Sequence, residues 1–150
     1  KAVVRFYESG ISGGKGGKKV NEISNADEES LIQSLLHADL VVTGQSTIAI
    51  DAAAFGKPTV IAAFDHEPRV YWDSVVRYFD YEYYRKFRER SGICMAWDPE
   101  ALRDLVKNYL KNPDLDKAVL ERIVHDQLYR FDGNASERLA SILLTSPHGH

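Results

Sequence analysis

Short apolar runs alternate along this chain with longer segments in which apolar side chains recur every three or four positions. Short runs predict strands, and the longer period predicts amphipathic helices. Strands that alternate with helices are typical of an α/β domain with a parallel sheet. We therefore predict a Rossmann-like parallel sheet flanked by helices, with extra helices at the C-terminal end. The predicted strands are 2–7, 39–43, 59–64 and 93–97, with a further candidate at 20–24, and the predicted helices begin at residue 25 and then span 47–55, 68–90 (one helix or two), 98–111, 115–129 and 134–144.

Two of these helices carry boundary signals in the sequence. Gly56 stands where the helix 47–55 should end, and Pro58, two residues later, cannot continue a helix. Asp98 supplies a capping carboxylate, and Pro99 occupies the first helical position after it. These signals predict the end of one helix and the start of another.

The turn after the strand 39–43 is the first candidate site. It consists of Gly44, Gln45, Ser46 and Thr47, all small or polar, and a helix follows directly. Free backbone N–H groups at a helix start attract anions, and a doubly wound sheet usually places a phosphate there. The structural alternative makes Ser46 only an N-cap and Gly44 only a tight turn. The turn by itself favours neither interpretation.

Asp51 favours the interpretation of this turn as a binding site. It lies one helical turn beyond Thr47, on the same predicted face. A carboxylate near a phosphate-binding turn is well placed to accept hydrogen bonds from a ribose diol. The alternative is an exposed acid that interacts weakly with the helix dipole.

A second candidate site follows the strand 59–64, where residues 65–69 read Asp-His-Glu-Pro-Arg. Ligands collect at the carboxyl edge of a parallel sheet, and His66 and Arg69 are our candidate catalytic residues there. The alternative is a polar loop that contains an ion pair. Neighbouring loop residues rarely all point at one centre, so Asp65, His66 and Glu67 do not make a metal site and we predict no metal.

Composition narrows the function classes. The 150 residues are 44% hydrophobic, which suits one globular domain with a core. A net charge of −3 argues against a nucleic-acid partner bound by bulk electrostatics. No apolar run approaches the ~20 residues of a membrane span. The lone Cys94 has no internal partner, which favours a reducing compartment and a cytoplasmic location.

The segment 68–90 interleaves aromatic with basic side chains. Its aromatic rings could pack on the sheet, contact another domain, lie on a membrane surface or stack on single-stranded RNA. Packing is the interpretation that the pattern favours, and RNA binding is the one it favours least. Lys15, Lys18 and Lys19 could add lipid contacts, although a flexible glycine-rich loop is the simpler interpretation of residues 9–19, where no frame satisfies the Walker A pattern.

Residues 38–58 resemble the donor-nucleotide signature of GT-B glycosyltransferases. They read Ala-Asp-Leu-Val-Val-Thr-Gly-x-Ser-Thr-x-x-x-Asp-Ala-x-x-x-Gly-Lys-Pro. The resemblance is closest to the branch of CDP-glycerol glycerophosphotransferases and surface-polysaccharide enzymes. Residues 131–138, Phe-Asp-Gly-Asn-Ala-Ser-Glu-Arg, are similar to the Asp-Gly-x-Ala-Ser-x-Arg element near that branch's C-terminus. The glycerophosphotransferases usually show Asp-Tyr-Ser-Ser where this chain has residues 44–47.

The resemblance implies a function and a site. Residues 1–150 would form the nucleotide-sugar-binding domain, the C-terminal half of a GT-B fold. Asp51 would bind the ribose of a nucleotide-activated sugar or polyol, the turn 44–47 its diphosphate, and His66 with Arg69 its transferred group. The donor is a substrate, so no resident cofactor is implied.

The chain starts with Lys1 rather than Met. We therefore expect a fragment of a two-domain transferase of cell-surface polymer biosynthesis, inactive without its N-terminal domain and cytoplasmic or peripheral to the membrane. A UDP-sugar 2-epimerase-like protein and a non-catalytic nucleotide-fold binding module are the alternatives.

Overall fold

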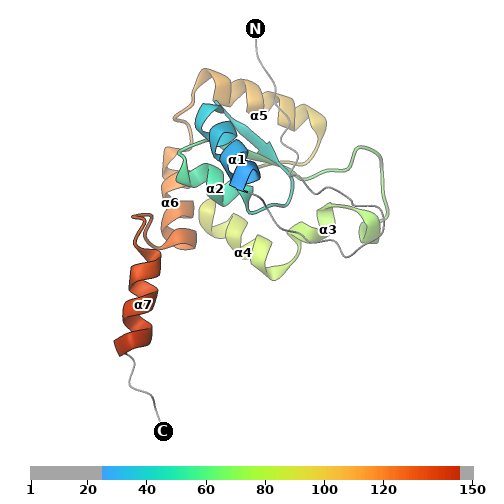
Figure 1. The fold of residues 1–150 in the computed structure, drawn as a ribbon. Coiled ribbons are helices and arrows are strands. Elements are labelled where there is room, and N and C mark those ends of the chain that lie inside the picture. The colour runs from blue at the N-terminus through green and yellow to red at the C-terminus, as the bar shows by residue number, and fades with distance from the viewer. Residues whose placement is uncertain (1–24, 146–150) are drawn as a thin grey trace.

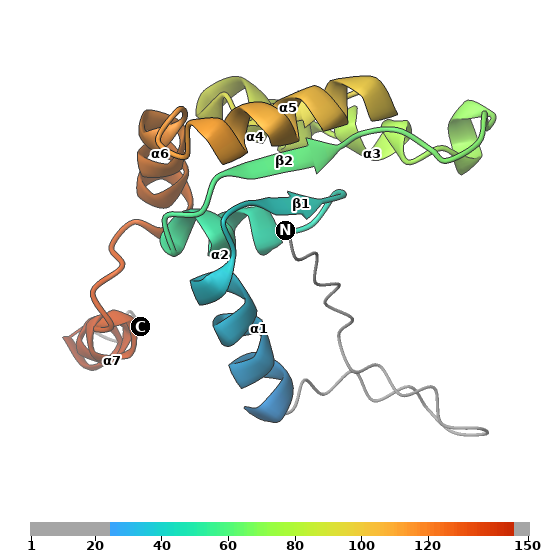
Figure 2. The same cartoon turned by 90° about the horizontal axis from the view of Figure 1, so that it is seen from above.

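A computed structural model of the chain describes residues 25–145. Three parallel strands form one sheet in the order β1-β2-β3, and helices lie against both of its faces (Figures 1 and 2). Val42 pairs with Val60, and Ile61 pairs with Met95. The prediction of an α/β fold with a parallel sheet flanked by helices is confirmed, whereas the predicted strands 2–7 and 20–24 lie outside the described residues. In chain order the elements are α1 (Asn25–His37), β1 (Val41–Thr43), α2 (Ile48–Ala54), β2 (Thr59–Ala62), the 3-10 turn η1 (Tyr71–Asp73), α3 (Val76–Phe79), α4 (Glu82–Ser91), β3 (Cys94–Ala96), α5 (Pro99–Lys111), α6 (Lys117–Leu128) and α7 (Ala135–Thr145).

The core lies on both sides of the central strand β2. Successive side chains of a strand point to opposite faces, so Val60 and Ile61 enter different clusters. Ile61 packs with residues of α2, α4 and α6, among them Ile123 of α6. Val60 packs with Tyr109 of α5 on the other face. Burial on both faces explains why this strand reads as a continuous apolar run.

The predicted helix boundaries are confirmed where the capping signals are strong. Gly56 follows Phe55, the C-cap residue of α2, and has φ +66°, a conformation that glycine adopts without a Cβ penalty. The Lys57 ammonium then donates a 3.0 Å hydrogen bond to the carbonyl oxygen of Leu36 in the last turn of α1. At α5, the Asp98 carboxylate accepts the Ala101 N–H at 2.8 Å, with Pro99 in the first turn.

The segment 68–90 is broken into more elements than the one or two helices that we predict. It contains a 3-10 turn and two helices, because Ser74 and Tyr81 both have extended backbone angles. Ser74 is held in that conformation by Asp65, whose carboxylate accepts the Ser74 hydroxyl at 2.6 Å and the Val75 N–H at 3.1 Å. This contact spans nine residues, so local periodicity could not reveal it.

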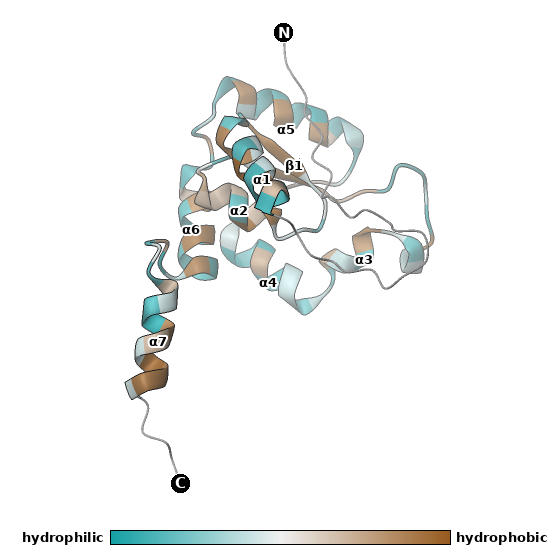
Figure 3. Cartoon of the chain, viewed as in Figure 1, coloured by the Kyte–Doolittle hydropathy of each residue, from teal (hydrophilic) through white to brown (hydrophobic). Residues whose placement is uncertain are grey.

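The C-terminal helix α7 projects away from the sheet and the other helices (Figures 1 and 2). None of its residues is buried. Its apolar side chains gather toward its C-terminal end, where Leu144 is 86% exposed (Figure 3). Within residues 25–145, no helix combines the length and apolarity needed to cross a membrane.

Candidate functional site

The carboxyl ends of all three strands meet at one edge of the sheet, since the strands are parallel. The turn 44–47 leaves this edge after β1, and the long connection 63–75 leaves it after β2 (Figure 2). Both predicted sites therefore begin at the same edge. This is the edge where open α/β sheets bind ligands.

The turn 44–47 is exposed, and its polar groups are largely unengaged. The Ser46 hydroxyl accepts the Ile48 N–H at 3.3 Å, so Ser46 does have the local role that the structural alternative gives it. Thr47 has helical backbone angles and makes no side-chain cap. Within residues 25–145, the backbone N–H groups of Ser46 and Thr47 have no hydrogen-bond partner. These two donors remain free for an anion.

Asp51 lies in the first turn of α2 and is exposed. Its backbone N–H donates to the Thr47 carbonyl oxygen at 3.4 Å, which confirms that the two residues are one helical turn apart. Partial burial raises the pKa of the Asp51 carboxyl above its ordinary value. Among the described residues its carboxylate has no hydrogen-bond or ion-pair partner, so its oxygens are available as acceptors.

Aromatic side chains of α4 pack against the other side of the turn. Tyr83, Tyr84 and Phe87 surround a gap beside Ser46 and Thr47 of only about 10 Å³. A gap of this size holds at most one water molecule. These rings pack against the turn and leave no room in this gap for a base or a sugar. The predicted packing on the sheet holds for Phe79 and Phe87, which enter the core, whereas Trp72 and Tyr81 are largely exposed.

Asp65 and His66 differ in what they do. The Ser74 hydroxyl, then the Val75 N–H and the nearby Arg69, hold the pKa of the Asp65 carboxyl below its usual value. Asp65 thus fixes the course of the connection 63–75. His66 is exposed, and within the described part of the chain no hydrogen bond or ion pair involves it.

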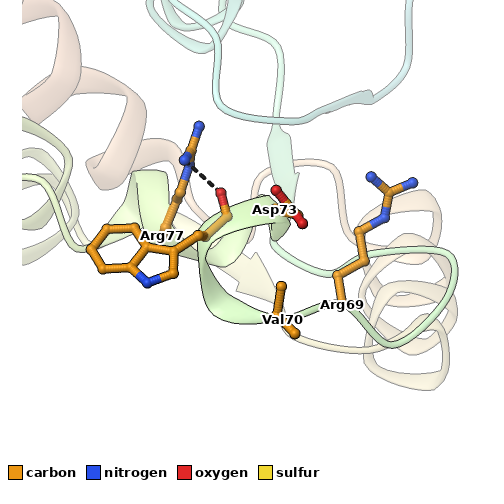
Figure 4. A pocket seen from close by; sticks show the side chains of 5 residues that line it. Arg69, Val70, Asp73 and Arg77 are labelled. Carbon is orange, nitrogen blue, oxygen red and sulfur yellow. Dashed lines mark hydrogen bonds between the residues drawn. The ribbon is translucent and has the colours of Figure 1, made fainter.

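Arg69 faces an open hollow of about 490 Å³ on this connection (Figure 4). The structure brings Arg69 together with residues that our sequence analysis did not select. Neither His66 nor any residue of the nucleotide-binding prediction lines this hollow. The aromatic and basic composition of 68–90 could have drawn attention to this segment, but the spacing of its residues does not indicate which of them line one hollow. The lining residues are Arg69, Val70, Trp72, Asp73 and Arg77.

The second motif of the resemblance folds as a local turn. The Asp132 carboxylate accepts both hydrogen bonds from Arg138, at 2.7 and 2.8 Å, and a third from the Asn134 N–H at 3.0 Å. The Arg138 guanidinium is the main reason why the pKa of Asp132 lies below its usual value. This arrangement fixes the entry into α7.

Acidic, histidine and cysteine side chains do not cluster as a metal site in the described residues. The predicted absence of a metal stays a prediction.

Cys94 lies in β3, where burial, together with the hydrogen bond to Asp116, raises the pKa of its thiol to about 11.

The raised pKa predicts a slow thiol. At pH 8 the folded chain should react with iodoacetamide about a hundredfold more slowly than the same chain unfolded in urea, because the thiolate fraction falls tenfold per pKa unit. The folded chain also keeps a proton that the unfolded chain releases, so the free energy of unfolding should fall as the pH rises from 9.0 toward about 11. Equal alkylation rates in the folded and unfolded chain would contradict this assignment.

No protein-family model matches this chain, and neither does any curated protein or solved structure. The resemblance of residues 38–58 and 131–138 to GT-B transferases therefore stays a hypothesis.

Proposed function

We propose that this chain binds the diphosphate of a nucleotide-activated sugar or polyol at the turn 44–47. The observation that carries the proposal is the open turn itself. Two unpaired backbone N–H groups, those of Ser46 and Thr47, lie at the carboxyl edge of a parallel sheet. Donors of this kind at a strand-to-helix turn suit phosphate oxygens.

Asp51 extends the proposal from an anion to a nucleotide. Its carboxylate lies one helical turn from Thr47 and has no partner in the described part of the chain. Its raised pKa indicates a group that loses solvation without gaining a hydrogen bond. A ribose diol would supply two donors to this carboxylate, while the diphosphate meets the turn.

The reaction that this binding would serve is group transfer in a GT-B-like enzyme of surface-polymer biosynthesis. The chain would be the donor-binding half, with its C-terminal GT-B sheet formed around β1, β2 and β3. Arg69 and His66 follow β2 at the same edge and would approach the transferred group. The transition state would be stabilised by positioning and by cations that neutralise the leaving diphosphate.

Calorimetric titration of the chain with CDP, UDP, GDP and ADP tests the binding step. We expect saturable binding of one diphosphate and weaker binding of the corresponding monophosphate, which lacks the second group that meets the turn. Asp51→Asn should lower the affinity about tenfold or more, since a hydrogen bond to a charged group contributes roughly 1.5–3 kcal/mol.

Asp104→Asn is the matched control, because Asp104 is an exposed helical acid on α5, across the sheet from α2. It should bind the nucleotide like the unmodified chain. Absence of binding by all four diphosphates, or equal affinity in Asp51→Asn, would overturn the proposal.

A further inference from the structure

The hollow beside η1, which we call the Arg69–Arg77 hollow, carries an unusual arrangement of charge. Arg69 and Arg77 lie on either side of it, and Asp73 lies between them (Figure 4). Neither guanidinium has a carboxylate within ion-pair distance in the described residues. Two arginines stand against one acid among the lining residues themselves, and Asp65 nearby interacts electrostatically with Arg69.

The walls of the hollow are fixed by hydrogen bonds. Asp65 holds Ser74 and Val75 at the base of the connection, at 2.6 and 3.1 Å. The Tyr71 hydroxyl donates to Asp80 at 2.8 Å. These contacts close the segment on itself, so the lining side chains project from an ordered wall. Preorganisation of this kind reduces the entropy lost when a ligand binds.

Arg77 is incompletely satisfied within this wall. One terminal nitrogen donates to the Trp72 carbonyl oxygen, and the other donates to the Tyr78 hydroxyl. The Nε atom is buried and has no hydrogen-bond partner in the described part of the chain. Among the described residues no carboxylate lies within ion-pair distance of this guanidinium, so an anion in the hollow would neutralise the cation through its terminal nitrogens.

Trp72 and Asp73 indicate what carries the anion. The Trp72 side chain is 73% exposed, and its only ring neighbour among the described residues, Tyr71, meets it edge-on at 5.2 Å. The indole is therefore left open, as a flat apolar surface with a polar edge. The Asp73 carboxylate, which also lines the hollow, can accept hydrogen bonds from hydroxyl groups. A hydroxyl acceptor that lies between two arginines (Figure 4) suits a hydroxylated ring with an anionic group.

We propose that the Arg69–Arg77 hollow binds a hydroxylated ring that bears an oxyanion, either a phosphate ester or a carboxylate. A guanidinium fork holds the oxyanion, and Asp73 accepts hydrogen bonds from the ring hydroxyls, while the exposed Trp72 lines the same hollow. The site does not depend on nucleotide binding, since it shares no residue with the turn 44–47 or with Asp51. It gives the chain a second recognition site on the connection that follows β2.

Titration calorimetry on the full chain tests this proposal with four probes: glucose 1-phosphate, glucuronate, glucose and inorganic phosphate. The phosphorylated sugar, the sugar acid or both should bind, and glucose and phosphate should each bind at least about tenfold more weakly. The two anionic probes distinguish a phosphate ester from a carboxylate. No binding of either one would overturn the proposal, and so would inorganic phosphate binding as tightly as the better sugar probe.

Variants locate the binding. Arg77→Lys and Arg69→Ala should each lower the affinity for the better sugar probe about tenfold. Arg69 is exposed and makes no hydrogen bond among the described residues, so its variant keeps the test valid if Arg77→Lys unfolds. Asp73→Asn should weaken glucose 1-phosphate relative to inorganic phosphate, because it removes the hydroxyl-binding carboxylate together with a charge that repels the phosphate. Arg103→Ala, an exposed position on α5, is the matched control, and equal affinity in Arg69→Ala and Arg103→Ala would place the binding elsewhere and overturn the proposal.

Discussion

Shortening Ile61 to alanine should lower the free energy of unfolding by about 2–5 kcal/mol. Ile61 is 2% exposed in the central strand β2, and it packs with α2, α4 and α6 in the larger core cluster. The substitution removes buried apolar surface and leaves a cavity that helices on a fixed sheet cannot fully close. Urea unfolding followed by far-UV circular dichroism measures the change.

Ile32→Ala is the control for this prediction. It deletes the same atoms from an isoleucine that is 43% exposed on α1, so the expected change is within about 0.5 kcal/mol. Similar losses in the two variants would show that burial in the Ile61 cluster is not what stabilises the chain, and would contradict the packing described here.

The second large effect is expected at Asp116, which precedes α6. Its carboxylate accepts a hydrogen bond from the hydroxyl of Tyr109, a residue of α5 that is only 1% exposed. The same oxygen accepts the Cys94 thiol at 3.3 Å. Asp116→Ala therefore leaves a buried hydroxyl without an acceptor, at a cost of about 1–3 kcal/mol in the free energy of unfolding.

Tyr109→Phe separates the hydrogen bond from the unpaired group. It removes the hydroxyl together with its need for an acceptor, so the expected cost is only about 0.5–1.5 kcal/mol. In the Asp116→Ala background, Tyr109→Phe should restore part of the lost stability, because no orphaned hydroxyl remains. If the double variant is less stable than Asp116→Ala by the full cost of Tyr109→Phe, the two residues are not coupled.

The effects expected at Ile61 and Asp116 depend on contacts between helices and strands. The positions of the helices and strands themselves can be predicted from local signals in the sequence. The helix predicted at 98–111 is α5, Pro99–Lys111, because the capping Asp98 and the proline of the first turn are adjacent in the sequence. The strand predicted at 59–64 is β2, shorter by two residues at its C-terminal end. Apolar periodicity and capping side chains act over one or two turns, so they can be identified without the rest of the chain.

The segment 68–90 shows where local signals fail. We predict one or two helices there, yet Ser74 has an extended backbone because its hydroxyl donates a hydrogen bond to Asp65, nine residues away. The same contact shapes the Arg69–Arg77 hollow. Arg69 and Arg77 line the same hollow because a 3-10 turn lies between them, and no regular period connects two positions across such a turn.

Some features of the candidate sites can likewise be predicted from local sequence, and others cannot. The exposed turn 44–47 and its relation to Asp51 could be predicted from the sequence, because a strand, a turn and one helical turn determine them. The aromatic rings packed against that turn and the charges around Arg77 came only with the tertiary structure. Each depends on contacts between side chains that are far apart in the sequence, and only the packing of the whole chain determines those contacts.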